Sequence, residues 1–457
     1  MPDDSFKEFA LDQLNTLPNV RTRTWFGGFL ASLLLFTASP AAWAQTDPHL
    51  AATTNYIFAS VPKSDIEYED RTEREFIAFN PNYKSLRAER ADKAQALGRQ
   101  VFAREAAGLN ILCSHQILFE LDWLLSDTAD FKKMDGRLRD LEESLAHPEN
   151  QAGAGEQDPE DGSWGRCSSE WFFKVNASYD HLAANKNEKP RYATHFLDRI
   201  NSPEKLTNYF LSVAVSDIPR TGVDNLREFN ESTANLMRLI LRDRPTDYAY
   251  DPQLKAALTN LFLQRLRNPA TGFWGESYVR DGRVQFVDSL SMTFHIISFL
   301  GGDVPDLPKV VDHTLAVKDL DYPVGWLRKG GYCNHHEMDV VTLFKFAWPQ
   351  ASAAQKQAMT IEIQKMLHWC LTESLQPDGS FKVDSSDDSI EEGNSNGVSF
   401  LSRLGYFDKS ERFWTTQDFP EVAGIREKII ANIKKHLASG GAGGAYYQGA
   451  LKDLKSE

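Results

Sequence analysis

One short motif occurs three times in the chain at nearly even spacing. Its copies read D-G-S-W-G at 161–165, T-G-F-W-G at 271–275 and D-G-S-F at 378–381. Aligned on their glycines, successive copies are 110 and 107 residues apart. Glycine permits a positive φ, and the aromatic side chain that follows can anchor a tight turn. The motif therefore predicts a chain built from three repeated structural units.

Helical patterns fill the chain between these turns. Amphipathic and strongly apolar segments alternate from residue 85 to residue 438, and no convincing series of strands or hairpins appears. The last two turns are each followed by a polar loop and a helix start rich in small residues, at 288–295 and 393–400. A unit of this length holds about four helices. We therefore expect an all-α fold of about twelve helices.

The N-terminus has the features of a secretory signal. Arg21 and Arg23 precede an apolar run from 25 to 38, and A-W-A at 42–44 matches a cleavage site. This predicts a signal peptide at 1–44 and a secreted or periplasmic protein. The long, acid-containing segment before the run leaves an uncleaved signal-anchor as the alternative.

The rest of the chain divides into three expected parts. An irregular segment at 45–84 leads to a helical domain at 85–438, and a glycine-rich tail follows at 439–457. The four cysteines, at 113, 167, 333 and 370, allow one or two disulfides in an oxidising compartment. Their pairing, and the alternative of free buried thiols, stays open. The net charge of −14 argues against a nucleic-acid partner.

The turn motifs resemble those of the α/α-toroid superfamily. P-x-x-G-x-W-G at 269–275 and Q-P-D-G-S-F at 376–381 are the segments that look alike. The superfamily includes terpenoid cyclases, prenyltransferase-like domains, and many polysaccharide lyases and glycosidases. The resemblance implies about six helical hairpins in a ring, with a central cavity lined by the starts of the inner helices.

Residues 330–339, G-G-Y-C-N-H-H-E-M-D, form the strongest candidate site, at the start of an apolar helix. His335 and Asp339 share a helix face at i, i+4, whereas His336 points elsewhere. In toroid lyases a substrate carboxylate is neutralised by Asn, His or Arg while a Tyr or His moves the proton beside it. By that resemblance, His335 or His336 is the base or neutraliser, and Asn334 a neutraliser. Tyr332 or Tyr278 is the acid or base.

Further candidates come from the loops and helix starts around the repeat. Trp274, Glu276, Tyr278 and Arg280 follow the second turn, where we expect a loop with a sugar platform and a carboxylate clamp. Three more residues occupy helix starts that would open on the same cavity: Asp288, His295 and Asn394. The structural alternatives are a buried turn anchor for Trp274 and a core histidine for His295.

The acidic loop before residue 393 allows a calcium site as an alternative. Asp387, Asp388 and Glu391 would supply its oxygen ligands, although a solvated acidic loop is the simpler interpretation. No zinc motif is present, because His336-Glu337 lacks a second histidine at the required spacing. We therefore expect no metal at the histidines and no dedicated cofactor.

The favoured hypothesis is a polysaccharide lyase that cleaves a uronate-containing glycan by β-elimination. The first alternative is a glycoside hydrolase that takes two carboxylates from Glu276, Asp288, Asp339, Glu391 and Glu392. The second and third are a terpenoid-cyclase-like enzyme and a non-catalytic binding toroid. The expected partner is a glycan, with no membrane contact beyond the targeting segment.

Overall fold

A computed structural model describes residues 68–151, 156–185, 189–242, 248–280, 282–327, 331–383, 389–438 and 444–454. The expected signal peptide at 1–44 lies outside these residues, as does most of the segment expected to be irregular. The described part confirms an all-α fold, because helices account for most of it and strands for very little.

The helices and strands are, in chain order, α3 (Tyr68–Phe79), α4 (Tyr83–Ala106), α5 (Leu112–Asp127), α6 (Phe131–Ala146), α7 (Trp171–Ala184), α8 (Pro203–Val213), α9 (Ile218–Thr221), α10 (Leu226–Met237), α11 (Leu254–Gln264), β1 (Gly275–Arg280), β2 (Arg283–Asp288), α12 (Leu290–Phe299), α13 (Leu307–Ala316), α14 (Asn334–Ala347), α15 (Ala353–Trp369), α16 (Ile390–Arg403), α17 (Val422–Ala438) and α18 (Gly444–Leu454). Two π-helical turns extend α10 and α15, at Arg238–Arg242 and Cys370–Ser374.

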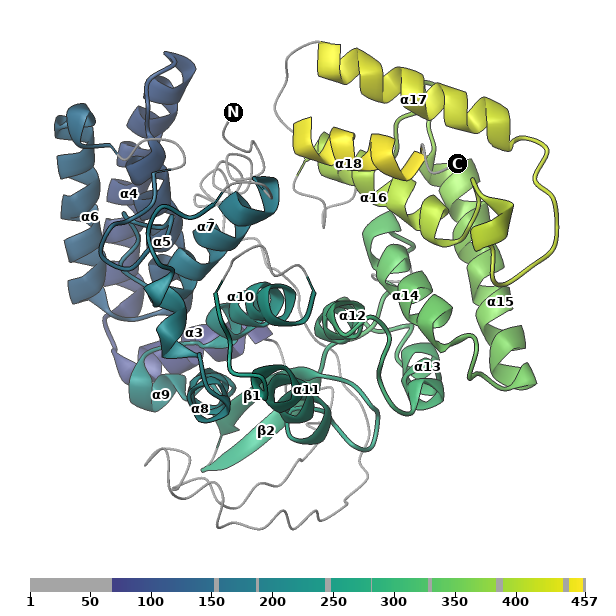
Figure 1. Ribbon diagram of the computed structural model, residues 1–457, viewed down its shortest axis with the longest axis horizontal. Coiled ribbons are helices and arrows are strands. Elements are labelled where there is room, and N and C mark those ends of the chain that lie inside the picture. Colours follow the sequence, from purple (N-terminus) through teal and green to yellow (C-terminus); the bar gives the residue numbers. More distant parts are fainter. Residues whose placement is uncertain are drawn as a thin grey trace.

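The helices form an arc (Figure 1), and from α7 onward they fall into two series. The first series is α7, α10, α12, α14, α16 and α18, and each member contacts the one before it. In the second series α8 contacts α11 and α13 contacts α15. Helices α12 and α14 bury most of their residues, whereas α17 buries few. Both series contribute to the large apolar core, which extends from α7 to α18.

The three turn motifs share one pattern of hydrogen bonds. In the first, Gly162 donates its N–H to the carbonyl of Asp158, and Asp158 donates to the carbonyl of Ser163. The second turn repeats both bonds, at 2.8 Å each, between residues 268 and 273, and the third closes similarly between 376 and 380. All three glycines have φ between 73° and 88°, which favours glycine. The repeat detected in the sequence is thus a repeat of backbone geometry.

Each turn is also bonded to a helix of the first series. The N–H of the motif's aromatic residue donates to a side-chain oxygen one or two helical turns inside that helix. The three pairs are Trp164 with Ser178 at 3.0 Å, Trp274 with Thr293 at 2.9 Å, and Phe381 with Asn394 at 2.7 Å.

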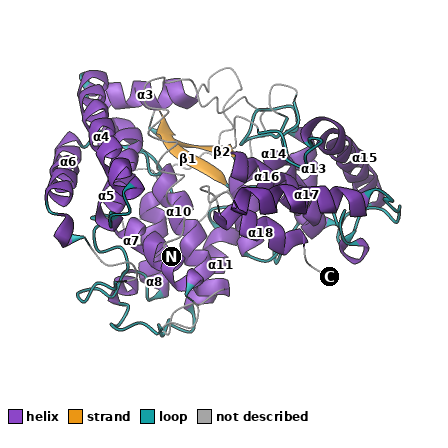
Figure 2. Ribbon diagram, turned by 90° about the horizontal axis from the view of Figure 1, so that it is seen from above, coloured by secondary structure: helices purple, strands orange, loops and turns teal. Residues whose placement is uncertain are grey.

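A β-hairpin is present where a polar loop was expected. Strands β1 and β2 pair antiparallel from Gly275 with Asp288 to Arg280 with Arg283 (Figure 2). The expectation of a polar loop after the second turn was therefore wrong, although this one hairpin does not make a series of strands. Alternating apolar residues on both sides of a D-G pair at 281–282 are a hairpin signal, and the helical patterns around it hid that signal.

Both ends of the described chain are more ordered than the sequence suggested. Helix α3 lies within the segment 45–84 that was expected to be irregular, and its Phe76 stacks on Tyr83 at 4.7 Å. Helix α18 lies within the expected glycine-rich tail. It packs on α16 and buries Tyr447 and Leu454, so apolar spacing outweighs the glycines there.

Cys113 and Cys167 form a disulfide that joins the start of α5 to the segment after the first turn. Cys333 and Cys370 are free and buried. The sequence had left the pairing open between these arrangements. No helix in the described part of the chain is long and apolar enough to cross a membrane.

The geometry of the first turn predicts a difference between two glycines with almost the same φ. A Cβ on Gly162 would lie 2.0 Å from the carbonyl oxygen of Ala193, whereas a Cβ on Gly108 would meet nothing within 4 Å. Both alanine variants incur a left-handed backbone cost of about 1 kcal/mol. Gly162→Ala adds a steric clash, so it should lower the free energy of unfolding by about 1–3 kcal/mol more than Gly108→Ala.

Chemical denaturation of both variants measures this difference directly. Equal destabilisation by the two alanines would contradict the close approach of the first turn to residue 193.

Candidate functional site

Polar side chains gather where α10, α12, α14 and α16 meet. We call them the histidine cluster, and all but Asp339 are half-buried. Its members are Arg238, His295, Tyr322, His335, Asp339 and Arg403.

His335 and Asp339 lie one turn apart on the same face of α14. Their proximity appears in the electrostatics, because the His335 charge partly offsets the rise in the pKa of Asp339. Burial is the larger effect, and it raises that pKa to about 7. The i, i+4 spacing in the sequence predicted this face. The pair combines a nitrogen base with a carboxyl group that can orient it.

Tyr322 lies at the centre of the cluster, although no sequence pattern had singled it out. Its hydroxyl donates to Oδ2 of Asp339 at 3.0 Å and also bonds the side chain of Ser291. Its ring stacks on His336 at 3.9 Å and lies 5.6 Å from the His335 ring. Burial raises the pKa of Tyr322 well above its ordinary value, so the phenol stays protonated.

Two arginines bring positive charge to the cluster. Arg403 donates from Nη1 to Thr342 at 3.0 Å and lies 5.7 Å from the Phe294 ring. Arg238 lies 5.3 Å from the Tyr179 ring and 5.2 Å from the Phe299 ring, so aromatic faces hold its guanidinium in place. The sequence offered a signal for both, since each is a charged residue inside an apolar helical run.

His295 lies between these charges. Its ring is 5.9 Å from Phe299 and stacked on it. Burial, with smaller contributions from the nearby His335, Arg238 and Arg403, lowers the pKa of His295 to about 4. The imidazole is therefore neutral near pH 7 and able to accept a proton.

Three other residues of the motif at 330–339 lie outside the cluster. Asn334 donates from Nδ2 to Ser374 at 2.6 Å, and the Tyr332 ring lies 6.1 Å from Trp369. Glu337 is fully buried, and neither of its carboxyl oxygens makes a hydrogen bond within the described residues. Helix geometry thus splits the motif at 330–339 between two environments.

The candidates after the second turn lie in the hairpin and not in a loop. Tyr278 is fully buried in β1, where its hydroxyl donates to Gln285 at 3.2 Å. Glu276 is buried near the start of β1, and Arg280 is half-buried at its end. Trp274 is only 1 % exposed, and its indole N–H donates to the carbonyl of Phe262 at 2.9 Å. A ring so enclosed anchors the turn and offers no face to a sugar.

Two residues that were predicted to line the cavity form bonds with the turns. Asp288 accepts from Asn268 at 3.0 Å and lies 3.1 Å from Nε2 of His313. Asn394 accepts the N–H of Phe381 through its side-chain oxygen. Each side chain points to its turn and fixes it to the following helix.

The acidic loop is described only in part. Asp387 and Asp388 lie outside the described residues, and Glu391 begins α16 as a half-buried side chain. Among the described residues, no three His, Cys, Asp or Glu side chains are placed to hold a metal ion. The calcium hypothesis stays a prediction.

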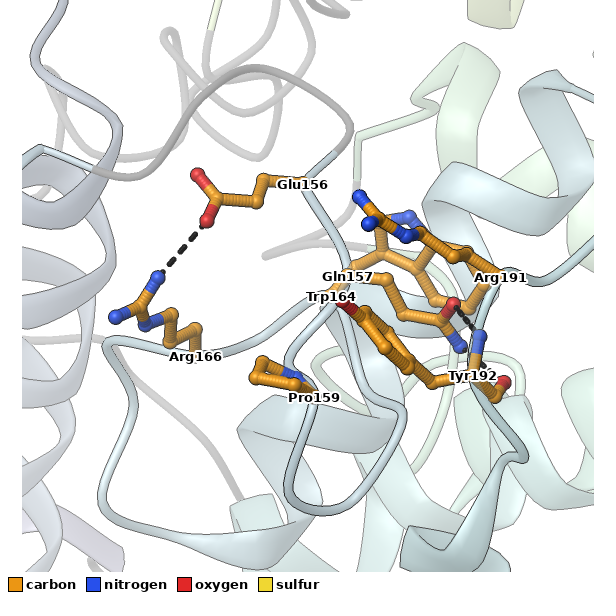
Figure 3. A pocket seen from close by; sticks show the side chains of 7 residues that line it. All are labelled: Glu156, Gln157, Pro159, Trp164, Arg166, Arg191 and Tyr192. Carbon is orange, nitrogen blue, oxygen red and sulfur yellow. Dashed lines mark hydrogen bonds and ion pairs between the residues drawn. The ribbon is translucent and has the colours of Figure 1, made fainter.

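A pocket of about 250 Å³ lies beside the first turn (Figure 3). Sequence patterns did not predict it, because it joins the turn to the segment 189–194 that folds back against it. Its lining combines aromatic, amide and charged side chains, namely Glu156, Gln157, Trp164, Arg166, Arg191 and Tyr192.

Comparison of the chain with protein-family models, with curated proteins and with solved structures found no match.

The buried Glu337 predicts a dependence of stability on pH. Burial raises its pKa well above the ordinary value, so the folded protein keeps a proton that the unfolded chain releases above about pH 4.3. The contribution of Glu337 to the free energy of unfolding is fully present below that pH, and it is lost as the pH rises toward the pKa of Glu337 in the folded protein. The loss is about 1.4 kcal/mol per pH unit in this interval.

Glu337→Gln removes the titration but keeps the shape of the side chain. Between about pH 5 and pH 8, the variant should gain free energy of unfolding relative to the wild type. The raised pKa of Asp339 acts in the same direction in both proteins and cancels in the comparison. Glu143→Gln, at a side chain that is 72 % exposed, is the matched control. Parallel pH profiles for Glu337→Gln and the wild type would show that Glu337 is ionised in the folded protein.

Proposed function

We propose that the first series of helices is the inner ring of an α/α toroid and that the second series is its outer ring. The ordered contacts within the first series and its greater burial support this arrangement. The repeated turns support it too, because each fixes the start of a first-series helix in the same way. On this proposal the histidine cluster faces the central cavity.

We propose further that the protein is a polysaccharide lyase acting on a uronate-containing glycan. The observation that supports this best is the composition of the histidine cluster. Two guanidinium groups, a neutral imidazole and a protonated phenol come together from three helices and one loop at a half-buried place. These are the groups that β-elimination beside a carboxylate requires.

In the proposed reaction Arg238 and Arg403 bind the uronate carboxylate and stabilise the charge that develops on it. His295 or His335 takes the proton from the carbon next to the carboxylate. The electron pair of that C–H bond forms a carbon–carbon double bond, and the bond to the glycosidic oxygen breaks. Tyr322 gives its proton to the leaving oxygen. Its raised pKa keeps the phenol protonated, so Tyr322 begins the step as the proton donor and not as the base.

This assignment differs from the one that the sequence suggested. Tyr322 takes the role proposed for Tyr332 or Tyr278, because its ring lies 5.6 Å from that of His335, whereas Tyr332 packs near Trp369 and Tyr278 bonds Gln285. The two arginines of the cluster take the role proposed for Asn334 and Arg280. His335 keeps its role, and His336 becomes a support that stacks on Tyr322.

A secreted or periplasmic location accords with this substrate class, since large glycans lie outside the cytoplasm. The signal at 1–44 and the disulfide of Cys113 with Cys167 both support it.

Glycoside hydrolysis is the second candidate, and one observation favours it. Asp339 has a pKa of about 7, which suits a general acid. Asp288 is another carboxylate that the sequence suggested, but it already contacts Asn268 and His313. A second catalytic carboxylate beside Asp339 is therefore harder to assign than the groups of a lyase.

Incubation of the purified protein with a panel of uronate polymers tests the proposal. A lyase produces unsaturated sugars that absorb in the ultraviolet, whereas a hydrolase releases reducing ends without that absorbance. His335→Ala and Tyr322→Phe should each lower kcat/KM by about 100-fold or more, the usual effect of removing an acid or base.

His195→Ala is the matched control, because its side chain is 65 % exposed and lies outside the cluster. Thermal melting checks that each variant folds. Ultraviolet-absorbing products that both active-site variants still form at the wild-type rate would refute the assigned roles. Reducing ends without absorbance would favour hydrolysis.

A further inference from the structure

We propose that the pocket beside the first turn is a second carbohydrate site, which binds one anionic sugar unit. The inference rests on the proposed function only for the choice of a glycan as ligand. Its location, shape and charge come from residues outside the histidine cluster (Figure 3).

The walls of the pocket are held together by one buried side chain. Gln157 donates from Nε2 to the carbonyls of Gly162 and Tyr192, both at 2.7 Å, and accepts the N–H of Tyr192 at 2.7 Å. The turn and the segment 189–194 are therefore fixed to each other without a ligand. A site built in this way binds with little cost of ordering.

The equivalent position in the second turn explains why a pocket is present in the first. Arg267 makes the corresponding bonds, from Nε to the carbonyl of Gly272 at 2.7 Å and from Nη1 to that of Pro305 at 2.8 Å. Its guanidinium lies 5.0 Å from the Trp274 ring. Gln157 is shorter and has no guanidinium to place beside the Trp164 ring, although it makes the corresponding bonds. The lining of the pocket by both Gln157 and Trp164 follows from that difference.

The aromatic residues of the pocket are held in place. The Trp164 ring stacks on His181 at 4.6 Å, and the backbone N–H of Trp164 donates to the Ser178 hydroxyl. Tyr192 is held by Gln157. Trp164 is 6 % exposed and mainly supports the wall, whereas the half-buried Tyr192 supplies aromatic surface beside polar groups, which suits the apolar face and hydroxyl edge of a sugar ring. The volume of about 250 Å³ lies below the range typical of drug-sized ligands, so it suits a single ring.

The charge of the lining selects an anion. Arg166 and Glu156 form an ion pair at 2.9 Å, which leaves this pair neutral. Arg191 is exposed, lies 5.2 Å from the Tyr192 ring, and has no carboxylate partner among the described residues. Its guanidinium is therefore available to a carboxylate or sulfate group of the sugar.

Calorimetry on the full chain tests the inference, with His335→Ala as background so that turnover does not consume the probes. The probes are trigalacturonate, a sulfated galactose disaccharide and neutral cellotriose. We expect at least one of the two anionic probes to bind, and Arg191→Gln to weaken that binding by about tenfold or more, the loss of one charge-assisted hydrogen bond. The anionic probe that loses affinity identifies carboxylate or sulfate as the recognised group.

Arg283→Gln is the matched control, because Arg283 is an exposed arginine on β2 and lies outside the pocket. Anionic-probe binding that is equal in Arg191→Gln, Arg283→Gln and the background protein would overturn the inference. If neutral cellotriose binds as tightly as the anionic probes, the pocket does not select for negative charge and that part of the inference is wrong. Turnover by the chain with His335 intact is measured separately, so pocket binding without turnover would refute only the proposed lyase.

Discussion

The rest of the fold depends on one hydrogen bond that occurs three times, from the N–H of a turn aromatic to a side chain of the following helix. In the second turn it joins Trp274 to Thr293, inside α12. The bond sets the level of α12 against the turn, and therefore the level at which His295 lies, half a helical turn further on. The first and third turns hold α7 and α16 by the same kind of bond, so three helices of the first series are fixed to their turns in one way.

Much of the fold could be predicted from the sequence, because turns and helices depend on local spacing. The repeat of 110 and 107 residues predicted geometry that the three turns share. A half-repeat escaped notice, since Trp326 follows Trp274 by 52 residues and also donates its indole N–H to a carbonyl twelve residues earlier. The hairpin escaped for the opposite reason, because its D-G signal is local but stands alone among helices. Helix α18 was hidden by the glycines before it.

The candidate site, like the fold, could be predicted only where it depends on local spacing. The pair of His335 and Asp339 follows from helical periodicity alone, and the structure places both on one face. Periodicity also places Asn334 on another face, toward Ser374, although residue type had grouped it with the histidines. Tyr322 and Arg403 could not be found by spacing. They reach Asp339 from elements distant in sequence, and only tertiary packing brings those elements together.

The electrostatics of the cluster show why its members belong together. Burial makes Arg238 and Arg403 costly unless negative charge lies close to them. Asp339 and Asp453 act on Arg403, and Glu231 acts on Arg238, while burial raises the pKa of Asp339 to about 7 and also raises that of Glu231. Asp339 therefore carries only part of a negative charge near neutral pH, and the aromatic faces beside Arg238 supply none. On the proposed function, a substrate carboxylate bound between the arginines would add negative charge to the cluster while His295 stays neutral and able to accept a proton.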